Sequence, residues 1–225
     1  MFEIIKKDPH SQARAGLIHT PHGIIETPAY AIVGTHGLIK CLPHQRIPET
    51  KTGLIMANTY HLWQDFKGPK GELENLPPVQ QFFGPNTPTI TDSGGFQVFS
   101  MGFGREHKTG KITDLYRKDL ETPKPEKNLV RITEEGTWFK QDNGPEQFLG
   151  PKLSMQIQEK LGADLILAFD ECTSPQHDYK YNKQAMDRTH RWAKICLEEK
   201  KRPDQIIYGI VQGVIFKDLR EESAK

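Results

Sequence analysis

Short runs of consecutive apolar residues recur along the chain and predict buried β-strands. Unbroken apolar runs of this length are typical of parallel strands that are covered on both faces. The runs lie at residues 53–57, 87–91, 165–169 and 206–211. A polar residue follows each run at once, so the expected strands end at Asn58, Asp92, Asp170 and Gln212.

Helical patterns separate these runs. Pro151 suits the first position of a helix, and Gly162 suits the position after its end. A longer helix is expected from near Tyr181 to Lys200, because apolar residues recur there at steps of three and four. That stripe contains Ala185, Met186, Thr189, Trp192, Ala193, Cys196 and Leu197. Alternating strands and helices imply βαβ units and favour an α/β fold of the TIM (β/α)8 barrel type.

The length of the chain predicts an incomplete barrel. A TIM barrel typically needs ~250 residues, whereas this chain has 225, enough for five or six strands in a single domain over residues 1–225. Residues 13–35 are expected to add an N-terminal β-hairpin, since two apolar runs flank the turn signal Thr20-Pro21-His22-Gly23. Residues 104–131 are rich in both charge signs and are expected to form an exposed insertion, with a phosphate or partner contact as the alternative.

The polar residues after the four apolar runs are the candidates for a functional site. In a TIM barrel the active site lies at the carboxyl ends of the strands, so the predicted fold would bring these four side chains together. The alternative is that each residue only caps the next helix or turn. Because all four runs end in this way, we favour a shared site.

The amino-acid composition mainly excludes classes of protein. Hydrophobic residues make up 36% and charged residues 26%, with a net charge of +1, which fits a folded protein and excludes a polybasic one but not a local RNA-binding patch. No run approaches the ~18 apolar residues of a membrane helix, and the first residues lack a signal peptide's apolar core, so we expect a cytoplasmic protein without membrane contact. The cysteines Cys41, Cys172 and Cys196 are far apart, which argues against a disulfide framework, a zinc site or another cofactor on this chain.

The segment Thr91-Asp92-Ser93-Gly94-Gly95-Phe96-Gln97 carries the strongest chemical signal. Glycines let backbone N–H groups approach a flat ligand closely, and Phe96 could stack on such a ligand. Asp92 could serve as an acid, a base or a nucleophile. Together with the residues that follow it, the segment resembles the signature of tRNA-guanine transglycosylases, the queuine tRNA-ribosyltransferases of bacterial type.

Further segments resemble the same family in the same order along the chain. They are Thr20–Gly23, Glu26–Pro28, Val33–Thr35, Ala57–Leu62, Ile132–Gly136, Leu161–Asp164, Phe169–Cys172 and Gly209–Gly213. The resemblance covers nearly the whole chain except residues 104–131. It implies a TIM barrel and an enzyme that exchanges guanine at the wobble position of tRNA anticodons for a 7-deazaguanine such as preQ1, in queuosine biosynthesis. It also implies a homodimer, and a zinc site in a C-terminal region of the family that no motif of this sequence matches.

The resemblance also implies roles for individual residues. Asp92 matches the residue that accepts and donates the proton, Asp170 the residue that reads the base edge, and Gln212 a residue that bonds the base carbonyl. Asn58 matches a supporting residue that orients the nucleophile. The residues expected to line the base pocket are Ser93, Gly94, Gly95 and Phe96. Glu171 is expected to act only through other residues, and Cys172 to form pocket wall.

The sequence departs from the family pattern toward its carboxyl end. The family's nucleophilic aspartate, basic tRNA contacts and Cys/His zinc ligands have no match here, so we expect this chain alone to be inactive and poorly soluble. Val214 stands where the family usually has a small residue after Gly213. Two other functions stay open: a non-catalytic subunit that binds a base or a partner chain, and another TIM-barrel enzyme acting on a small phosphorylated ligand.

Overall fold

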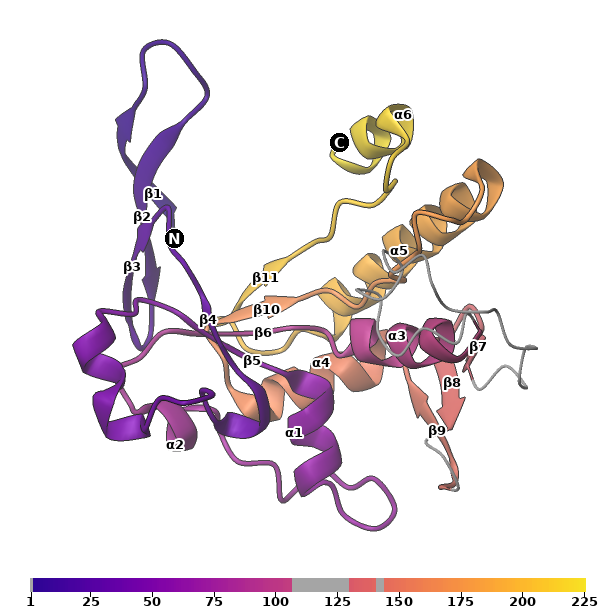
Figure 1. Cartoon of the computed structure of the whole chain (residues 1–225), viewed down its shortest axis with the longest axis horizontal. Coiled ribbons are helices and arrows are strands. Elements are labelled where there is room, and N and C mark those ends of the chain that lie inside the picture. The colour runs from indigo at the N-terminus through magenta and orange to yellow at the C-terminus, as the bar shows by residue number, and fades with distance from the viewer. Residues whose placement is uncertain (1, 107–129, 141–143) are drawn as a thin grey trace, which may run out of the picture. The chain divides into compact units, whose positions relative to one another are not determined.

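The computed structural model describes residues 2–106, 130–140 and 144–225 (Figure 1). The chain divides into two compact units, which are described separately. Unit 1 comprises Met1–Ser93, Met155–Leu167 and Glu199–Tyr208. Unit 2 comprises Gly94–Ser154, Ala168–Glu198 and Gly209–Lys225.

Unit 1 is built on a parallel sheet of five strands (Figure 1). Its members are β4 (Ile32–Gly34), β5 (Ile55–Ala57), β6 (Thr89–Thr91), β10 (Leu165–Leu167) and β11 (Ile206–Tyr208). They lie side by side in chain order, and every neighbouring pair is parallel. A doubly wound sheet reverses its strand order at one point, whereas a sheet wound in one direction, as in a barrel, does not. The predicted α/β class with parallel strands is therefore confirmed, and the sheet is open among the described residues.

All four predicted strands are shorter than the apolar runs that predicted them, and two of them end before their runs do. β10 ends at Leu167 rather than Phe169. The side-chain amide of Gln158 takes up the backbone N–H and carbonyl of Leu167, so backbone pairing does not continue past this residue. The Leu167 N–H donates to Gln158 Oε1 at 3.1 Å, and Gln158 Nε2 donates to the Leu167 carbonyl at 2.9 Å. Within the described ranges, β11 pairs only with β10 and ends opposite it at Tyr208. The prediction that Asp170 and Gln212 directly follow strands is therefore wrong.

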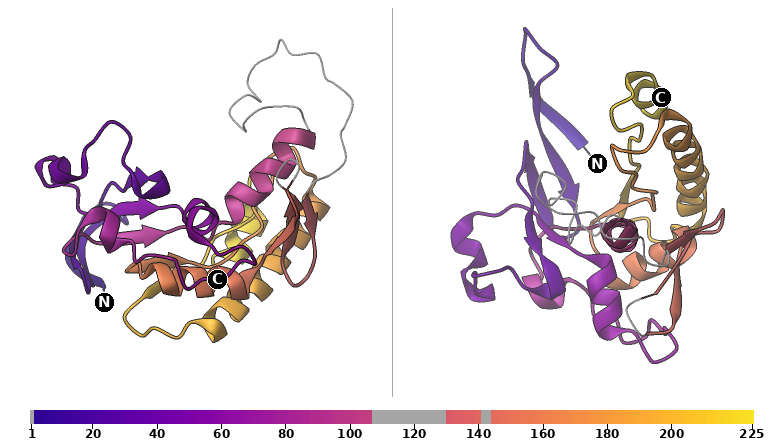
Figure 2. Two further views of the ribbon diagram at one scale, coloured as in Figure 1. Left: turned by 90° about the horizontal axis from the view of Figure 1, so that it is seen from below. Right: turned by 45° about the vertical axis from the view of Figure 1, so that its right-hand side comes forward.

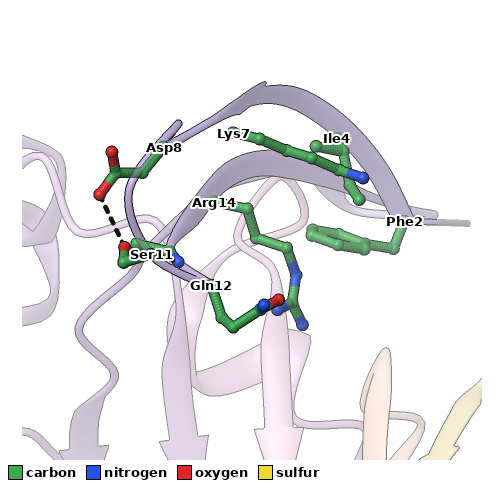
Figure 3. Close-up of a pocket in the computed structure, with 8 residues that line it drawn as sticks. Phe2, Ile4, Lys7, Asp8, Ser11, Gln12 and Arg14 are labelled. Carbon is green, nitrogen blue, oxygen red and sulfur yellow. Dashed lines mark hydrogen bonds between the residues drawn. The ribbon is translucent and has the colours of Figure 1, made fainter.

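The N-terminal part of unit 1 is a three-stranded antiparallel sheet. The predicted hairpin is confirmed as β2 (Arg14–Thr20) and β3 (Gly23–Thr27), and β1 (Phe2–Lys7) pairs with β2 as an additional strand. All six residues of β1 are exposed, and its sequence does not show the apolar–polar alternation of a half-buried strand. The sequence pattern therefore gave no sign of this strand. The β1–β2 connection encloses an open hollow of about 400 Å³, in which the Arg14 guanidinium lies 5.9 Å from the Phe2 ring centre (Figure 3).

A small apolar core and one buried carboxylate join the two sheets of unit 1. Ile25 of β3 packs with Leu54 and Leu165, which lie at the parallel sheet. The buried Asp164 bonds the hairpin turn and β6 together: its Oδ1 lies 2.8 Å from His22 Nδ1, and its Oδ2 accepts the Thr89 N–H at 2.9 Å. The helical segments of unit 1 are η1 (Thr35–Gly37), η2 (His44–Thr50), α1 (Thr59–Phe66) and α2 (Gln80–Phe83).

Unit 2 contains helices and a second antiparallel sheet (Figure 2). The sheet has the order β7-β8-β9, with β7 (Val130–Ile132), β8 (Thr137–Lys140) and β9 (Glu146–Leu149). Its helices are α3 (Gly95–Glu106), α5 (Tyr179–Glu199) and α6 (Lys217–Ser223), while α4 (Pro151–Leu161) begins in unit 2 and continues into unit 1. The sequence did not predict this sheet, because each of its strands contains a charged residue and none forms an apolar run.

The two predicted helices are confirmed. α4 spans Pro151–Leu161 and stops before Gly162, and α5 begins two residues earlier than expected. The apolar stripe of α5 is buried along most of its length, but Leu197 is exposed, so its assignment to the core is wrong. Most of the predicted insertion at 104–131 lies outside the described residues, and its described ends belong to α3 and β7. Within the described ranges, no helix is long and apolar enough to cross a membrane.

Candidate functional site

Asp92 follows β6 directly, and its carboxylate lies at the N-terminus of α1. The backbone N–H of Thr59 donates to Asp92 Oδ1 at 2.9 Å, and Asn58 Nδ2 donates to Asp92 Oδ2 at 2.6 Å. The Thr59 hydroxyl also donates to the Asp92 backbone carbonyl at 2.5 Å. A helix N-terminus favours a negative charge, so this half-buried carboxylate is both oriented and electrostatically supported.

Asn58 has two functions at once. Its Oδ1 accepts the backbone N–H of His61 at 3.0 Å, which caps α1, while its Nδ2 holds Asp92. The capping alternative therefore holds for this buried residue, and its part in a functional site stays a prediction. The resemblance implied that Asn58 orients a nucleophile, whereas the carboxylate that it contacts in this structure is that of Asp92.

Gln158 supports Asp92 from the interior of unit 1. Its side chain is fully buried, and its Oε1 accepts the Thr91 hydroxyl at 2.9 Å in addition to the Leu167 N–H. Thr91 is the residue immediately before Asp92, so Gln158 fixes the end of β6 from which the carboxylate projects. Sequence reasoning missed Gln158; the signal was a polar residue on the apolar side of the predicted helix.

Asp170 and Gln212 form a second hydrogen-bonded pair, in unit 2. Gln212 Nε2 donates to Asp170 Oδ2 at 2.9 Å, and the Gln212 backbone N–H donates to Ser223 Oγ at 2.9 Å. A carboxylate only accepts hydrogen bonds, whereas an amide nitrogen carries two donors. The pair can therefore accept an N–H and also donate to a carbonyl oxygen. Gly213 beside it has φ +107°, and a Cβ there would lie 2.6 Å from the Arg220 nitrogen, so α6 can approach only a glycine.

The chain passes from unit 1 to unit 2 inside the predicted pocket segment, between Ser93 and Gly94. Ser93 is buried, and Gly94 has φ +79°, a left-handed conformation that favours glycine. Gly95 begins α3, and the side chain of Phe96 on its first turn is 48% exposed. This ring is therefore accessible from solvent, and its stacking on a ligand stays a prediction.

The thiol of Cys172 is not suited to nucleophilic attack. Burial raises its pKa to about 11, with a further contribution from the charge of Asp170. Because the thiolate is the reactive form, the raised pKa argues against a nucleophilic role, and the place of Cys172 in a pocket wall stays a prediction. Among the described residues, no cluster of three or more His, Cys, Asp or Glu side chains could hold a metal ion.

The structure thus joins the four predicted polar residues in two pairs, Asn58–Asp92 in unit 1 and Asp170–Gln212 in unit 2. That all four meet in one site stays a prediction. The class of protein defined so far is an α/β protein with a parallel sheet wound in one direction and carboxylate–amide pairs in the segments after its strands.

Comparison with known proteins narrows that class. The family model described as Queuine tRNA-ribosyltransferase matches residues 8–225, and the chain belongs to this family. Curated relatives include the queuine tRNA-ribosyltransferases of Staphylococcus aureus strains JH9, JH1 and Mu3. Each is 40% identical over 226 residues, a match that covers 100% of this chain and 52% of the relative. The chain therefore spans about half the length of the curated relatives it matches.

Proposed function

We propose that this chain carries the purine-binding and proton-transfer residues of a tRNA-guanine transglycosylase, a pentosyltransferase. In this reaction the wobble guanine of a tRNA anticodon is exchanged for a 7-deazaguanine such as preQ1, in the cytoplasm, on the way to queuosine. Membership of the Queuine tRNA-ribosyltransferase family supports the reaction class. The observation that carries the proposal is the Asp92 carboxylate, held by Asn58 and Thr59 directly after a parallel strand.

The chemistry of the reaction requires a group such as Asp92. Breaking the N-glycosidic bond leaves a cation-like sugar at C1′ and a base whose ring nitrogen must gain a proton. We propose that Asp92 delivers that proton and removes one from the incoming base. A second carboxylate would trap C1′, and we assign that role to no described residue. No step of this scheme uses a metal; the family's zinc would require ligands that the described residues do not provide.

The second pair accounts for base recognition in this proposal. Guanine and preQ1 share adjacent N–H donors and a carbonyl oxygen on one edge. Asp170 would accept from those donors, and the Gln212 amide would donate to the carbonyl. The exposed ring of Phe96 would stack on the base, with Ser93, Gly94 and Gly95 as pocket wall. The wobble base has to leave its stack in the anticodon loop to reach such a pocket.

Two features of the proposal concern the whole protein. We propose that the five parallel strands are part of an eight-stranded TIM barrel contained in one domain, because their order follows the chain without reversal. We further propose that the whole protein binds the tRNA anticodon loop and acts as a homodimer, as the family resemblance implies.

Asp92→Asn tests the catalytic role. In the protein of native length that carries this sequence, incorporation of radiolabelled guanine into tRNA is expected to fall at least about 100-fold, because the amide cannot exchange a proton. Binding of tRNA, measured by gel shift, is expected to change little. Asp187→Asn, which alters a partly exposed aspartate on α5 that pairs with Lys183, serves as the matched control. Retained guanine exchange in Asp92→Asn would remove Asp92 from the mechanism.

The alternative function is that of a non-catalytic base-binding or partner subunit. It is favoured by the Asp170–Gln212 pair, which can recognise a base without Asp92. Calorimetric titration with guanine and preQ1 separates the two functions. Base binding together with guanine exchange supports the enzyme, whereas base binding without exchange supports the subunit. Asp170→Asn is expected to weaken base binding in either case.

A further inference from the structure

A buried carboxylate that the proposed reaction does not use lies next to Asp170. The side chain of Glu171 is 1% exposed. Its Oε1 accepts the Tyr181 hydroxyl at 2.8 Å, and its Oε2 is bonded by the Arg188 guanidinium. Its backbone N–H donates to Thr189 Oγ1 at 3.0 Å. All three partners belong to α5, so one helix holds both the main chain and the side chain of Glu171.

These contacts make the position of Glu171 hard to change. A buried carboxylate without partners is costly, and removing one partner of a buried ion pair leaves an uncompensated charge. Glu171 therefore stays attached to α5 at three points. Because Asp170 is the preceding residue, the same contacts fix the main chain from which the Asp170 side chain projects.

The helix that holds Glu171 is itself anchored to the β7–β8 turn. Arg188 Nε donates to Glu134 Oε1 at 3.1 Å, and Arg191 donates to Glu134 Oε2 at 2.9 and 2.7 Å. Trp192 Nε1 donates to the Glu134 backbone carbonyl at 2.7 Å. Burial lowers the pKa of Arg188, but Glu171 and Glu134 raise that pKa by more. The hydrogen bonds from Arg191 are the main reason that the pKa of Glu134 is lowered.

We propose that Glu171 is a positioning residue, which aims the Asp170 carboxylate at Gln212 and at the N–H donors of the bound base. Discrimination between bases then depends on α5, through Tyr181 and Arg188, although neither residue touches the base. This inference rests on the proposed function, because it assumes that Asp170 reads the base edge. A merely structural network would affect stability but not the choice of base.

Tyr181→Phe tests the inference in the protein of native length. The variant removes only the hydroxyl that bonds Glu171. The measurement is the ratio of guanine to hypoxanthine affinity by calorimetric titration, since hypoxanthine lacks the exocyclic amine donor. We expect the ratio to fall about fivefold, because a misplaced carboxylate loses two hydrogen bonds to guanine and only one to hypoxanthine, which keeps the ring N–H. In the exchange assay, the KM for guanine is expected to rise with little change in kcat.

Tyr179→Phe is the matched control. It removes a second tyrosine hydroxyl from α5, which donates to Asp218 at 2.7 Å on an exposed surface and does not touch Glu171. The base ratio is expected to stay unchanged in this variant. If Tyr181→Phe does not fold, Arg188→Lys replaces it, because lysine keeps a cation beside Glu171 but loses the planar fork. The same fall in the ratio is then expected.

The outcomes separate this inference from the proposed function. Guanine binding by the unchanged protein, with an unaltered base ratio in Tyr181→Phe, would overturn the positioning role and leave the proposed function intact. A lower melting temperature with an unaltered ratio would do the same, because it identifies the network as purely structural. If the unchanged protein binds neither base, the proposed function fails and this inference fails with it.

Discussion

Val214 has a backbone conformation that valine seldom adopts. Its φ is +44°, in the left-handed region that favours glycine. It follows Gly213, and the sequence had already marked it as a departure from the small residue that the family resemblance implies there. A branched Cβ in this region costs roughly 1–2 kcal/mol. The chain therefore carries local strain two residues after Gln212.

Val214→Gly is expected to stabilise the protein by about 0.5–1 kcal/mol. The change removes the left-handed penalty, which exceeds the extra entropy that glycine loses on folding. The midpoint of urea unfolding measures the effect in the protein of native length. Val211→Gly is the control: Val211 is exposed and has no positive φ, so that change is expected to destabilise. An equal loss of stability in both variants would contradict the strain at Val214.

At the scale of residues, Asn58 and Asp92 could be selected from the sequence, whereas the hydrogen bond between them could not. Asn58 and Asp92 directly follow strands, and a polar residue at a strand end can be found by reading the chain. Their hydrogen bond could not be read in this way, because it depends on rotamers and on the start of α1. Gln158 was missed for the opposite reason: a glutamine in a helix usually faces solvent, and this one is fully buried.

At the scale of elements, one helix residue determines where two strands end. Gln158 of α4 bonds the Thr91 hydroxyl at the end of β6 and both backbone groups of Leu167 at the end of β10. Its own backbone carbonyl accepts from the buried side chain of Gln205, which precedes β11. This arrangement joins α4 to three neighbouring strands through hydrogen bonds that water cannot replace.

Gln158→Leu is expected to destabilise the protein by about 2–4 kcal/mol. Leucine has a similar size but leaves the Leu167 N–H and the Thr91 hydroxyl without acceptors in a buried environment. Chemical denaturation followed by circular dichroism measures the change. Gln156→Leu, on the exposed side of the same helix, is expected to stay within about 0.5 kcal/mol of the unchanged protein. Similar small effects in both variants would show that these groups find other partners.

The elements that the sequence predicted share one property, a buried apolar face. The parallel strands were visible as unbroken apolar runs, and the long helix α5 as an apolar stripe at helical spacing. β1 is exposed on both sides, and each strand of the β7–β9 sheet contains a charged residue that interrupts any apolar run. The ends of β10 and β11 were placed too late, because apolar residues continue past the point where backbone pairing stops.

At the scale of the whole molecule, the parallel sheet has two open edges among the described residues. β4 and β11 each have a neighbour on one side only. Val33 of β4 and Tyr208 of β11 are exposed large side chains at these edges. Unpaired strand edges with apolar side chains are templates for pairing with another chain. The α/β class could be predicted from the sequence, whereas barrel closure involves contacts that these strands do not make.

A polypeptide limited to these 225 residues is therefore expected to associate in solution and to be inactive in guanine exchange. Light scattering after size exclusion, together with calorimetry, tests the first expectation. Val33→Lys at the β4 edge is expected to reduce the association, because a charged side chain disfavours edge pairing. A monodisperse 225-residue chain that melts cooperatively would contradict this prediction.

The strand order of unit 1 also bears on how the protein is made. From β5 onward, each strand of the parallel sheet pairs with the member of the same sheet that comes before it in the chain. During synthesis β4 waits for β5, and every later strand of this sheet then meets a neighbour that has already left the ribosome. The longest stretch of chain between two strands of this sheet separates β6 from β10, and it contains α3, the β7–β9 sheet and α4. The sheet is suited to growing in the direction of translation, one strand at a time.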